Sequence, residues 1–171
     1  MTTGDAASVT ERRGQFVPES WADAEDRYEA LGATAQSVVR ETARAMSFDR
    51  AEYDDRVTAD VVETARQTLF AETLAVRVAD REAFDTWRET YADGVRIAGS
   101  DAVDHVAWHV SPAAGSAVAA TFQNEADAAV GTVRRMAFNR LYRDRLTGAD
   151  DGETDGVERA DGEGGTAEGT E

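Results

Sequence analysis

The sequence predicts an α+β fold in which N-terminal helices precede a β-α-β-β-β-α unit with a mostly antiparallel sheet of about four strands. Apolar residues recur at helical spacing up to about residue 72, and their period changes from about 3.6 to about 2 at Leu74. After Leu74, segments with alternating apolar residues are interrupted and followed by segments with helical spacing. This order of patterns is typical of an α+β domain.

N-terminal helices are expected where a side chain that can cap a helix precedes apolar residues at helical spacing. The first helix is expected to end at Gly32, because glycine is common just past a helix C-terminus. The last of them is expected to run to about Glu72. The N-caps expected for these helices are Ser20, Thr34, Asp49 and Thr58.

The second part of the chain alternates in the manner of strands, since successive side chains of a strand point to opposite faces of a sheet. Asp80 is expected to cap a helix that contains Phe84 and Trp87 on its apolar face, and Asn124 a final helix that runs to about Leu146. The expected strands are residues 74–80, 95–98, 105–110 and 117–123.

The composition indicates an extreme halophile. The chain has 34 acidic and 18 basic residues, a net charge of -16, and every basic residue is arginine. Such a charge destabilises a compact chain by self-repulsion unless concentrated salt screens it. We therefore expect a cytoplasmic haloarchaeal protein, and we interpret its acidity as adaptation to solvent rather than as a sign of function.

Several classes of site are excluded by missing residue types. The chain has no cysteine and no lysine, which excludes disulfides, thiolate metal sites, phosphate loops of the Walker type and Schiff bases. No apolar run approaches the ~20 residues that span a bilayer. We expect no membrane association and no cofactor.

The two ends of the chain lack the apolar periodicity of the middle. Residues 1–14 are expected to be a disordered N-terminus, and residues 15–147 a single α+β domain. Residues 148–171 hold nine acidic residues and one arginine, and are expected to be an acidic disordered tail.

His105 and His109 are the two histidines of the chain, and they fall in one expected strand. Four residues along a strand span about 13 Å, so one metal ion cannot join the pair, and no metal site is expected. The alternation places both on one face of the sheet with Arg77 and Arg96. Either the N-terminal helices cover this candidate polar face, or it is open and binds an anion or a partner; the first alternative is favoured because the helices must bury their apolar faces.

The last helix carries five arginines between residues 134 and 145. Arg134 and Arg145 fall near the centre of its apolar arc, which makes them candidate buried arginines that need an acidic partner or an anion. The others are scattered around the helix, and residues 1–147 carry a net charge of -8. Nucleic-acid binding is therefore not expected, although the N-terminal helices leave room for a helix-turn-helix arrangement with Arg66 and Gln67 on its second helix.

Four segments carry a resemblance to a known family: "RYEALG", "SFDRAEYDDRVTADVVETAR", "VDHVAWH" and "RRMAFNRLYRDRL". They resemble a small uncharacterised family found in haloarchaea, over roughly residues 15–147. The resemblance implies a single domain in a halophile and no particular activity.

The function expected from the residues is a non-enzymatic interaction or regulatory module that binds another protein. Two alternatives stay open. One is a transcription-associated module of the helix-turn-helix kind, and the other is an enzyme or small-anion binder that uses Arg77, Arg96, His105 and His109.

Overall fold

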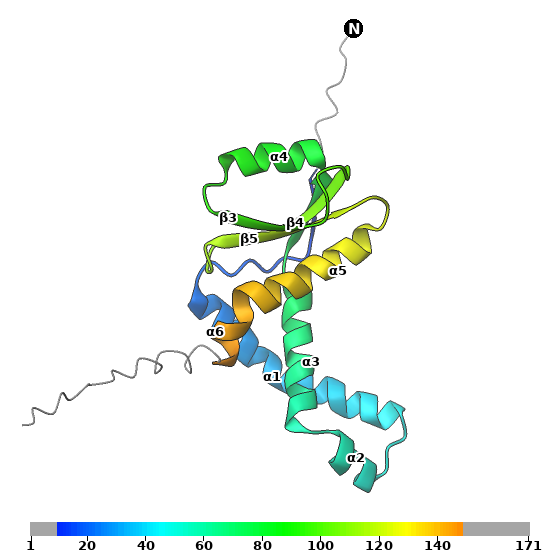
Figure 1. The fold of residues 1–171 in the computed structure, drawn as a ribbon. Coiled ribbons are helices and arrows are strands. Elements are labelled where there is room, and N and C mark those ends of the chain that lie inside the picture. Colours follow the sequence, from blue (N-terminus) through cyan, green and yellow to red (C-terminus); the bar gives the residue numbers. More distant parts are fainter. Residues whose placement is uncertain (1–9, 149–171) are drawn as a thin grey trace, which may run out of the picture.

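The structure is a computed structural model that describes residues 10–148, and it confirms the predicted α+β class (Figure 1). An N-terminal helical part is followed by strands and helices that alternate. The order is β1 (Glu11–Arg13), α1 (Trp21–Ala45), α2 (Arg50–Arg56), α3 (Ala59–Thr73), β2 (Val76–Asp80), α4 (Arg81–Thr90), β3 (Gly94–Ala98), β4 (His105–Ser111), β5 (Ser116–Phe122), α5 (Ala126–Ala137), the π-helical turn η1 (Phe138–Tyr142) and α6 (Arg143–Thr147).

The strands form one mixed sheet in the order β1-β2-β4-β5-β3. Strand β3 is parallel to β5, and the other neighbouring pairs are antiparallel, as the sequence predicts for most of the sheet. The sheet has five strands rather than about four because Glu11–Arg13 pair with β2 at its edge. These three residues lie within segment 1–14, for which the sequence predicts disorder. Of the two ends for which the sequence predicts disorder, residues 1–9 and 149–171 lie outside the described range.

Helix α1 is one helix of 25 residues, so the predicted break at Gly32 and the predicted cap at Thr34 are wrong. A Cβ at Gly32 would lie 3.7 Å from the guanidinium of Arg66, which places the glycine where α3 passes close to α1. The helix continues because packing against α3 outweighs the roughly 1 kcal/mol that an interior glycine costs. The predicted caps at Ser20, Asp49 and Thr58 are confirmed, since each side chain accepts a backbone N–H of the first turn.

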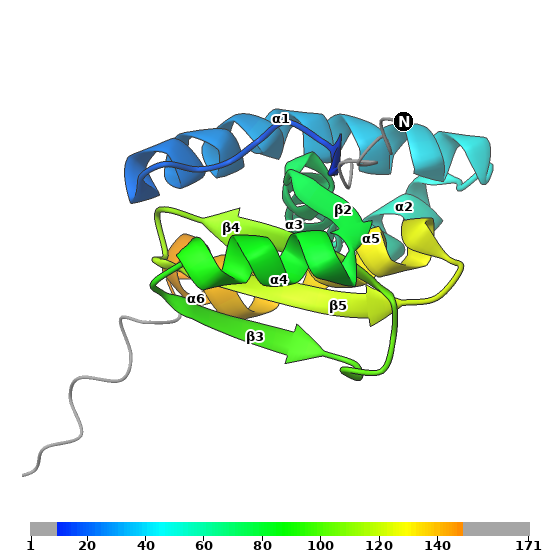
Figure 2. The same cartoon turned by 90° about the horizontal axis from the view of Figure 1, so that it is seen from above.

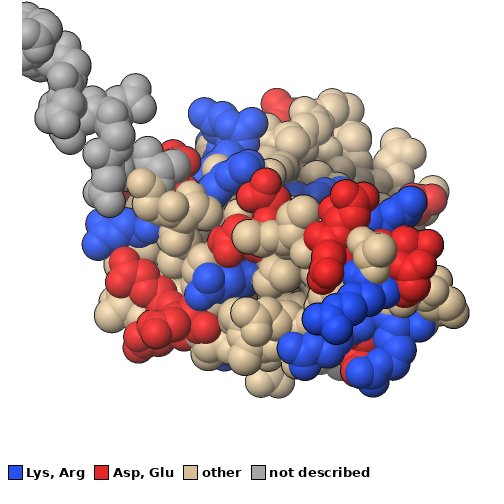
Figure 3. Space-filling model, turned by 90° about the horizontal axis from the view of Figure 1, so that it is seen from below, with Lys and Arg blue, Asp and Glu red and all other residues tan. Residues whose placement is uncertain are grey.

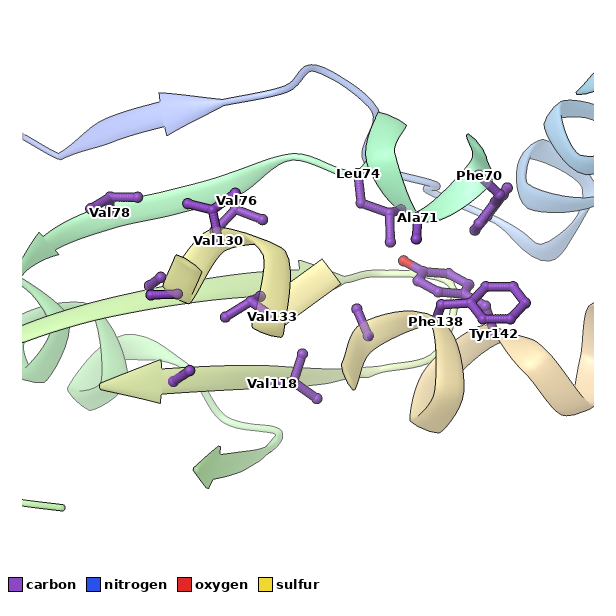
Figure 4. Packing of buried hydrophobic residues seen from close by; sticks show 14 of the residues in the cluster. Phe70, Ala71, Leu74, Val76, Val78, Val118, Val130, Val133, Phe138 and Tyr142 are labelled. Atoms are coloured by element: carbon purple, nitrogen blue, oxygen red, sulfur yellow. The ribbon is translucent and has the colours of Figure 1, made fainter. Parts of the chain in front are cut away.

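Helices cover both faces of the sheet. Helix α4 lies on one face, where Phe84 and Trp87 contact Trp108 (Figure 2). Helix α5 and η1 lie on the other face, and α3 and α1 pack behind them (Figure 1). The larger core forms on that side, where Phe70, Phe138 and Tyr142 meet the aliphatic side chains of the sheet (Figure 4).

The C-terminal half of α1, all of α2 and the first half of α3 extend away from the sheet (Figure 1). We call residues 35–65 the helical arm. Helix α2 has no buried residue, so the arm lacks a core of its own beyond the contact between α1 and α3. Between residues 10 and 148, no helix combines the length and the apolar character needed to cross a bilayer.

Candidate functional site

The register of the sheet separates the four residues of the predicted polar face. Arg77 lies directly opposite Trp108, whereas Arg96 and His109 both lie opposite Val118. Because opposite residues share a face and successive residues do not, Arg77 lies on the α4 face and Arg96 lies with His109 on the α5 face. The prediction that all four residues share one face is wrong for Arg77.

His109 is fully buried beneath η1 and cannot meet a solute. Its Nδ1 lies 2.7 Å from the carbonyl oxygen of Ala75, and its Nε2 lies 2.7 Å from the hydroxyl of Tyr142. Burial lowers the pKa of His109 to about 4, so the imidazole is neutral near pH 7. Both ring nitrogens are occupied by partners, and the residue belongs to the core.

His105 is exposed at the start of β4, where its ring stacks on Phe122 with 5.3 Å between the ring centroids. It shares a face with His109, but the first histidine is open to solvent and the second is enclosed. In the described residues, no group of three or more histidine, aspartate or glutamate side chains is arranged to hold a metal ion.

Arg77 is the cross-strand neighbour of Arg12 in β1. Partial burial, followed by the charge of Arg12, lowers the pKa of the Arg77 guanidinium. It is separated from the other three candidates by the sheet itself. Arg96, in the edge strand β3, is exposed and lines a pocket on the α5 face.

The two candidate buried arginines of the last helix differ. The Arg134 side chain is only 14% exposed, and it donates to the Leu74 carbonyl at 3.1 Å and pairs with Glu72 at 3.5 Å. The Arg145 side chain is 53% exposed, pairs with Glu25 and lies over the ring of Trp21. Arg134 is therefore mostly buried and satisfied within the protein, whereas the prediction of burial is wrong for Arg145.

The helix-turn-helix alternative depends on α3 presenting Arg66. The Arg66 guanidinium instead donates to the Tyr28 carbonyl at 2.6 Å and lies over the Tyr28 ring, so it holds α3 on α1. Seen from the side on which α2 lies, several arginine side chains gather in one area, and acidic side chains border and interrupt it (Figure 3). The contacts of Arg66 and the acidic side chains in this area count against phosphate binding by α3.

The structure adds a surface that the sequence does not single out, an apolar groove in the helical arm. The large hydrophobic side chains that are exposed among residues 10–148 are Val38, Met46 and Val61, with exposed fractions of 43%, 59% and 42%. All three line one groove of about 430 Å³ between α1, the α1–α2 connection and α3. Arg56 is the one charged residue that lines it.

The groove is not predictable from the sequence because the same residues belong to the regular apolar stripes of α1 and α3. A stripe predicts that a helix face is covered, but it does not say whether this chain or another molecule covers it. The one signal available is the shortness of α2, whose seven residues carry only Ala51 and Tyr53 as apolar side chains.

Comparison with curated proteins and with solved structures gives no significant match. A family model does match, over residues 15–143, which include the strands β2 to β5 and the helical arm. Its description is a family of unknown function, DUF5809. The match extends over more than half of the chain, and the protein therefore belongs to this family of unknown function.

Proposed function

We propose that this protein is a non-enzymatic interaction module and that the groove of the helical arm binds an amphipathic helix of a partner protein. The observation that carries the proposal is the gathering of Val38, Met46 and Val61, the exposed large hydrophobic residues of the described range, in one groove. Single exposed hydrophobic residues are normal on a soluble domain, whereas several that form one contiguous surface usually mark a binding site.

The shape of the groove favours a helical occupant. Its two long walls are α1 and α3, and its lining includes aliphatic side chains from both helices. A third helix laid between two helices buries residues at positions i, i+3, i+4 and i+7, which is the usual mode of helix recognition by a groove.

The charge of the groove favours an acidic flank on that helix. Arg56 lines the groove with its guanidinium over the Phe48 ring, 5.5 Å from the ring centroid, and no acidic residue lines it. A carboxylate next to the apolar face of the partner helix can pair with Arg56 as the apolar side chains enter the groove.

Co-purification of the tagged protein from its native cells at high salt, followed by mapping on the purified pair, tests the proposal. A partner retained by the wild type should be lost with Met46→Glu and with Val61→Glu, which place a charge in the groove at exposed positions that tolerate it. Thr90→Glu, at an exposed position at the end of α4, is the matched control and should retain the partner. A synthetic helix from that partner should then perturb NMR signals of Val38, Met46 and Val61.

Three results would overturn the proposal. A partner that survives both groove variants binds elsewhere. A partner peptide that perturbs NMR signals only of residues outside 38–65 would likewise show that the groove is not its binding site. Sedimentation that shows a dimer of the wild type and a monomer of Met46→Glu would mean that a second copy of this chain fills the groove instead.

We also propose that the protein works in the molar salt of a haloarchaeal cytoplasm. The support is the net charge of -16 with arginine as its sole basic residue type. Molar salt shortens the Debye length to about 3 Å and screens the repulsion between carboxylates. Circular dichroism should show loss of helix as KCl is lowered from about 2 M to about 0.1 M. An unchanged helical signal would contradict the proposed adaptation to molar salt and would leave the proposal for the groove unaffected.

A further inference from the structure

We infer that the pocket between β3, β5 and η1 binds a small organic anion through Arg96 and Arg140. This site is separate from the groove of the helical arm. It lies on the α5 face at the open edge of the sheet, where β3 has a neighbouring strand on one side only (Figure 2).

The floor of the pocket comes from two parallel strands. Arg96 of β3 lies directly opposite Val118 of β5, and Ser116 lies two residues before Val118 on the same face. The guanidinium donors of Arg96 and the Ser116 hydroxyl are therefore presented together, whereas Val118 between them is nearly fully buried.

The wall of the pocket comes from η1, which contributes Asn139, Arg140 and Leu141. A π-helical turn inserts one residue into a helix and so rotates the side chains that follow by about 100°. The same turn places Tyr142 against His109 in the core. The π-helical turn thus both directs Tyr142 into the core and supplies the side chains that form the wall of the pocket.

Within the described residues, the two arginines of this pocket have no partner of their own. In the described part of the chain, neither Arg96 nor Arg140 forms a hydrogen bond or an ion pair, although the protein has nearly twice as many acidic as basic residues. Asp144 also lines the pocket, but it forms no ion pair with either. Two guanidinium groups and one carboxylate leave a net charge of +1, which suits an oxyanion.

The size and lining of the pocket indicate what the oxyanion is attached to. Its volume of about 400 Å³ falls in the range of small-ligand sites and exceeds the needs of an inorganic ion alone. Leu141, which is partly exposed, offers apolar contact to a carbon skeleton. Asp144 can accept a hydrogen bond from a hydroxyl or ammonium group. The ligand class is a small organic molecule with a carboxylate or phosphate group, held by forked guanidinium donors.

NMR titration of the full chain, read on the arginine Nε–Hε signals at constant potassium concentration, tests this inference. Succinate probes the carboxylate and glycerol phosphate probes the phosphate monoester. We expect saturable shifts of the Arg96 and Arg140 signals with at least one probe. Saturation by one probe alone identifies the group, and saturation by both shows a general oxyanion site.

Variants separate a built site from general attraction to arginine. Arg96→Gln and Arg140→Gln should each weaken binding about tenfold, or about 1.4 kcal/mol, since each removes a charge-assisted hydrogen bond to the anion. Asp144→Asn should strengthen binding several-fold because it removes a repelling carboxylate. Arg88→Gln, on the opposite face, is the control and should leave binding unchanged.

Shifts that stay linear with concentration, or that are the same in Arg96→Gln as in the wild type, would overturn the inference. The exposed position of both arginines means that these variants should fold, and circular dichroism checks this. Since none of the substituted residues lines the groove of the helical arm, failure here leaves the proposed interaction function untouched.

Discussion

The hydroxyl of Tyr142 donates a hydrogen bond to Nε2 of His109, with 2.7 Å between the two atoms. The direction follows from the other side of the ring, where Nδ1 lies 2.7 Å from the Ala75 carbonyl oxygen. A carbonyl oxygen can only accept, so Nδ1 carries the proton and Nε2 is the acceptor. Burial keeps this ring neutral near pH 7. Protonation of Nε2 would place a charge in the core and turn the Tyr142 hydroxyl from donor to acceptor, and this couples the protonation of His109 to the stability of the core.

The first prediction is that the free energy of unfolding falls at acidic pH because of His109. The pKa of His109 is about 4 in the folded protein, against about 6.5 in an unfolded chain. The unfolded state therefore binds the proton more readily, so this contribution to stability is complete above about pH 6.5 and is lost as the pH falls toward 4. The two pKa values correspond to about 3 kcal/mol, measurable as the free energy of unfolding by denaturant at constant salt.

Substitutions of the two histidines isolate this contribution from that of the surface carboxylates. His109→Gln should remove most of the loss between pH 6.5 and pH 4, relative to the wild type. His105→Gln is the matched control, because His105 is exposed, and it should keep the wild-type pH profile. Parallel profiles for wild type and His109→Gln would show that His109 is not the group responsible.

The second prediction concerns the hydroxyl of Tyr142. Tyr142→Phe should destabilise the protein by about 1–2 kcal/mol at pH 7, because Nε2 of His109 is left buried without a donor. As a donor to Nε2, the hydroxyl favours the neutral ring, so its removal should also raise the folded-state pKa of His109 and make the acid-dependent loss of stability smaller. Tyr53→Phe in α2, whose hydroxyl has no partner among the described residues, should change neither quantity.

The third prediction compares two glycines with positive φ. Gly99 has φ +120°, and a Cβ there would lie 1.8 Å from Oγ1 of Thr121; Gly115 has φ +63°, with no neighbouring atom within 4 Å of its Cβ. Gly115→Ala should therefore cost about 1 kcal/mol from backbone strain alone. Gly99→Ala should cost about 2–4 kcal/mol, because a steric clash adds to the strain.

Denaturant unfolding of both glycine variants measures the difference. Adding Thr121→Ala to Gly99→Ala should recover part of the loss, since it removes the atom nearest to the new Cβ. Equal costs at the two glycines, or no recovery in the double variant, would mean that the loop shifts to accommodate the methyl group.

Local features of this fold were predictable because they depend on neighbours in the chain. Ser20, Asp49, Thr58 and Asp80 cap helices as expected, since a cap needs only its own first turn. Asn124 is an exception: the N-cap position of α5 is the next residue, Glu125, and its side chain makes no cap hydrogen bond. The continuous α1 departs from prediction because its glycine is accommodated by Arg66 of α3, a contact between distant residues.

The sides of the sheet were less predictable, and so was the candidate site. Alternation divides a strand into two sets of residues, but it does not say which set of one strand joins which set of the next. Helices cover both sides of this sheet, so both sets of alternating residues are largely apolar. The pattern therefore does not reveal which set faces which side. Arg77 was consequently assigned to the wrong face. The groove was hidden for a related reason, because apolar stripes look alike whether or not the chain covers them.

The fourth prediction separates the two arginines that the sequence placed together in the apolar arc of the last helix. Arg134→Gln should destabilise the protein by about 1–3 kcal/mol, because the mostly buried side chain bonds the Leu74 carbonyl where α3 passes into β2. Arg145→Gln should cost less than about 1 kcal/mol, since its pair with Glu25 is half exposed and screened by salt. Raising KCl should shrink the Arg145 effect and leave most of the Arg134 effect in place. Equal losses in the two variants, measured by denaturant unfolding, would mean that the Leu74 carbonyl finds another donor when Arg134 is removed.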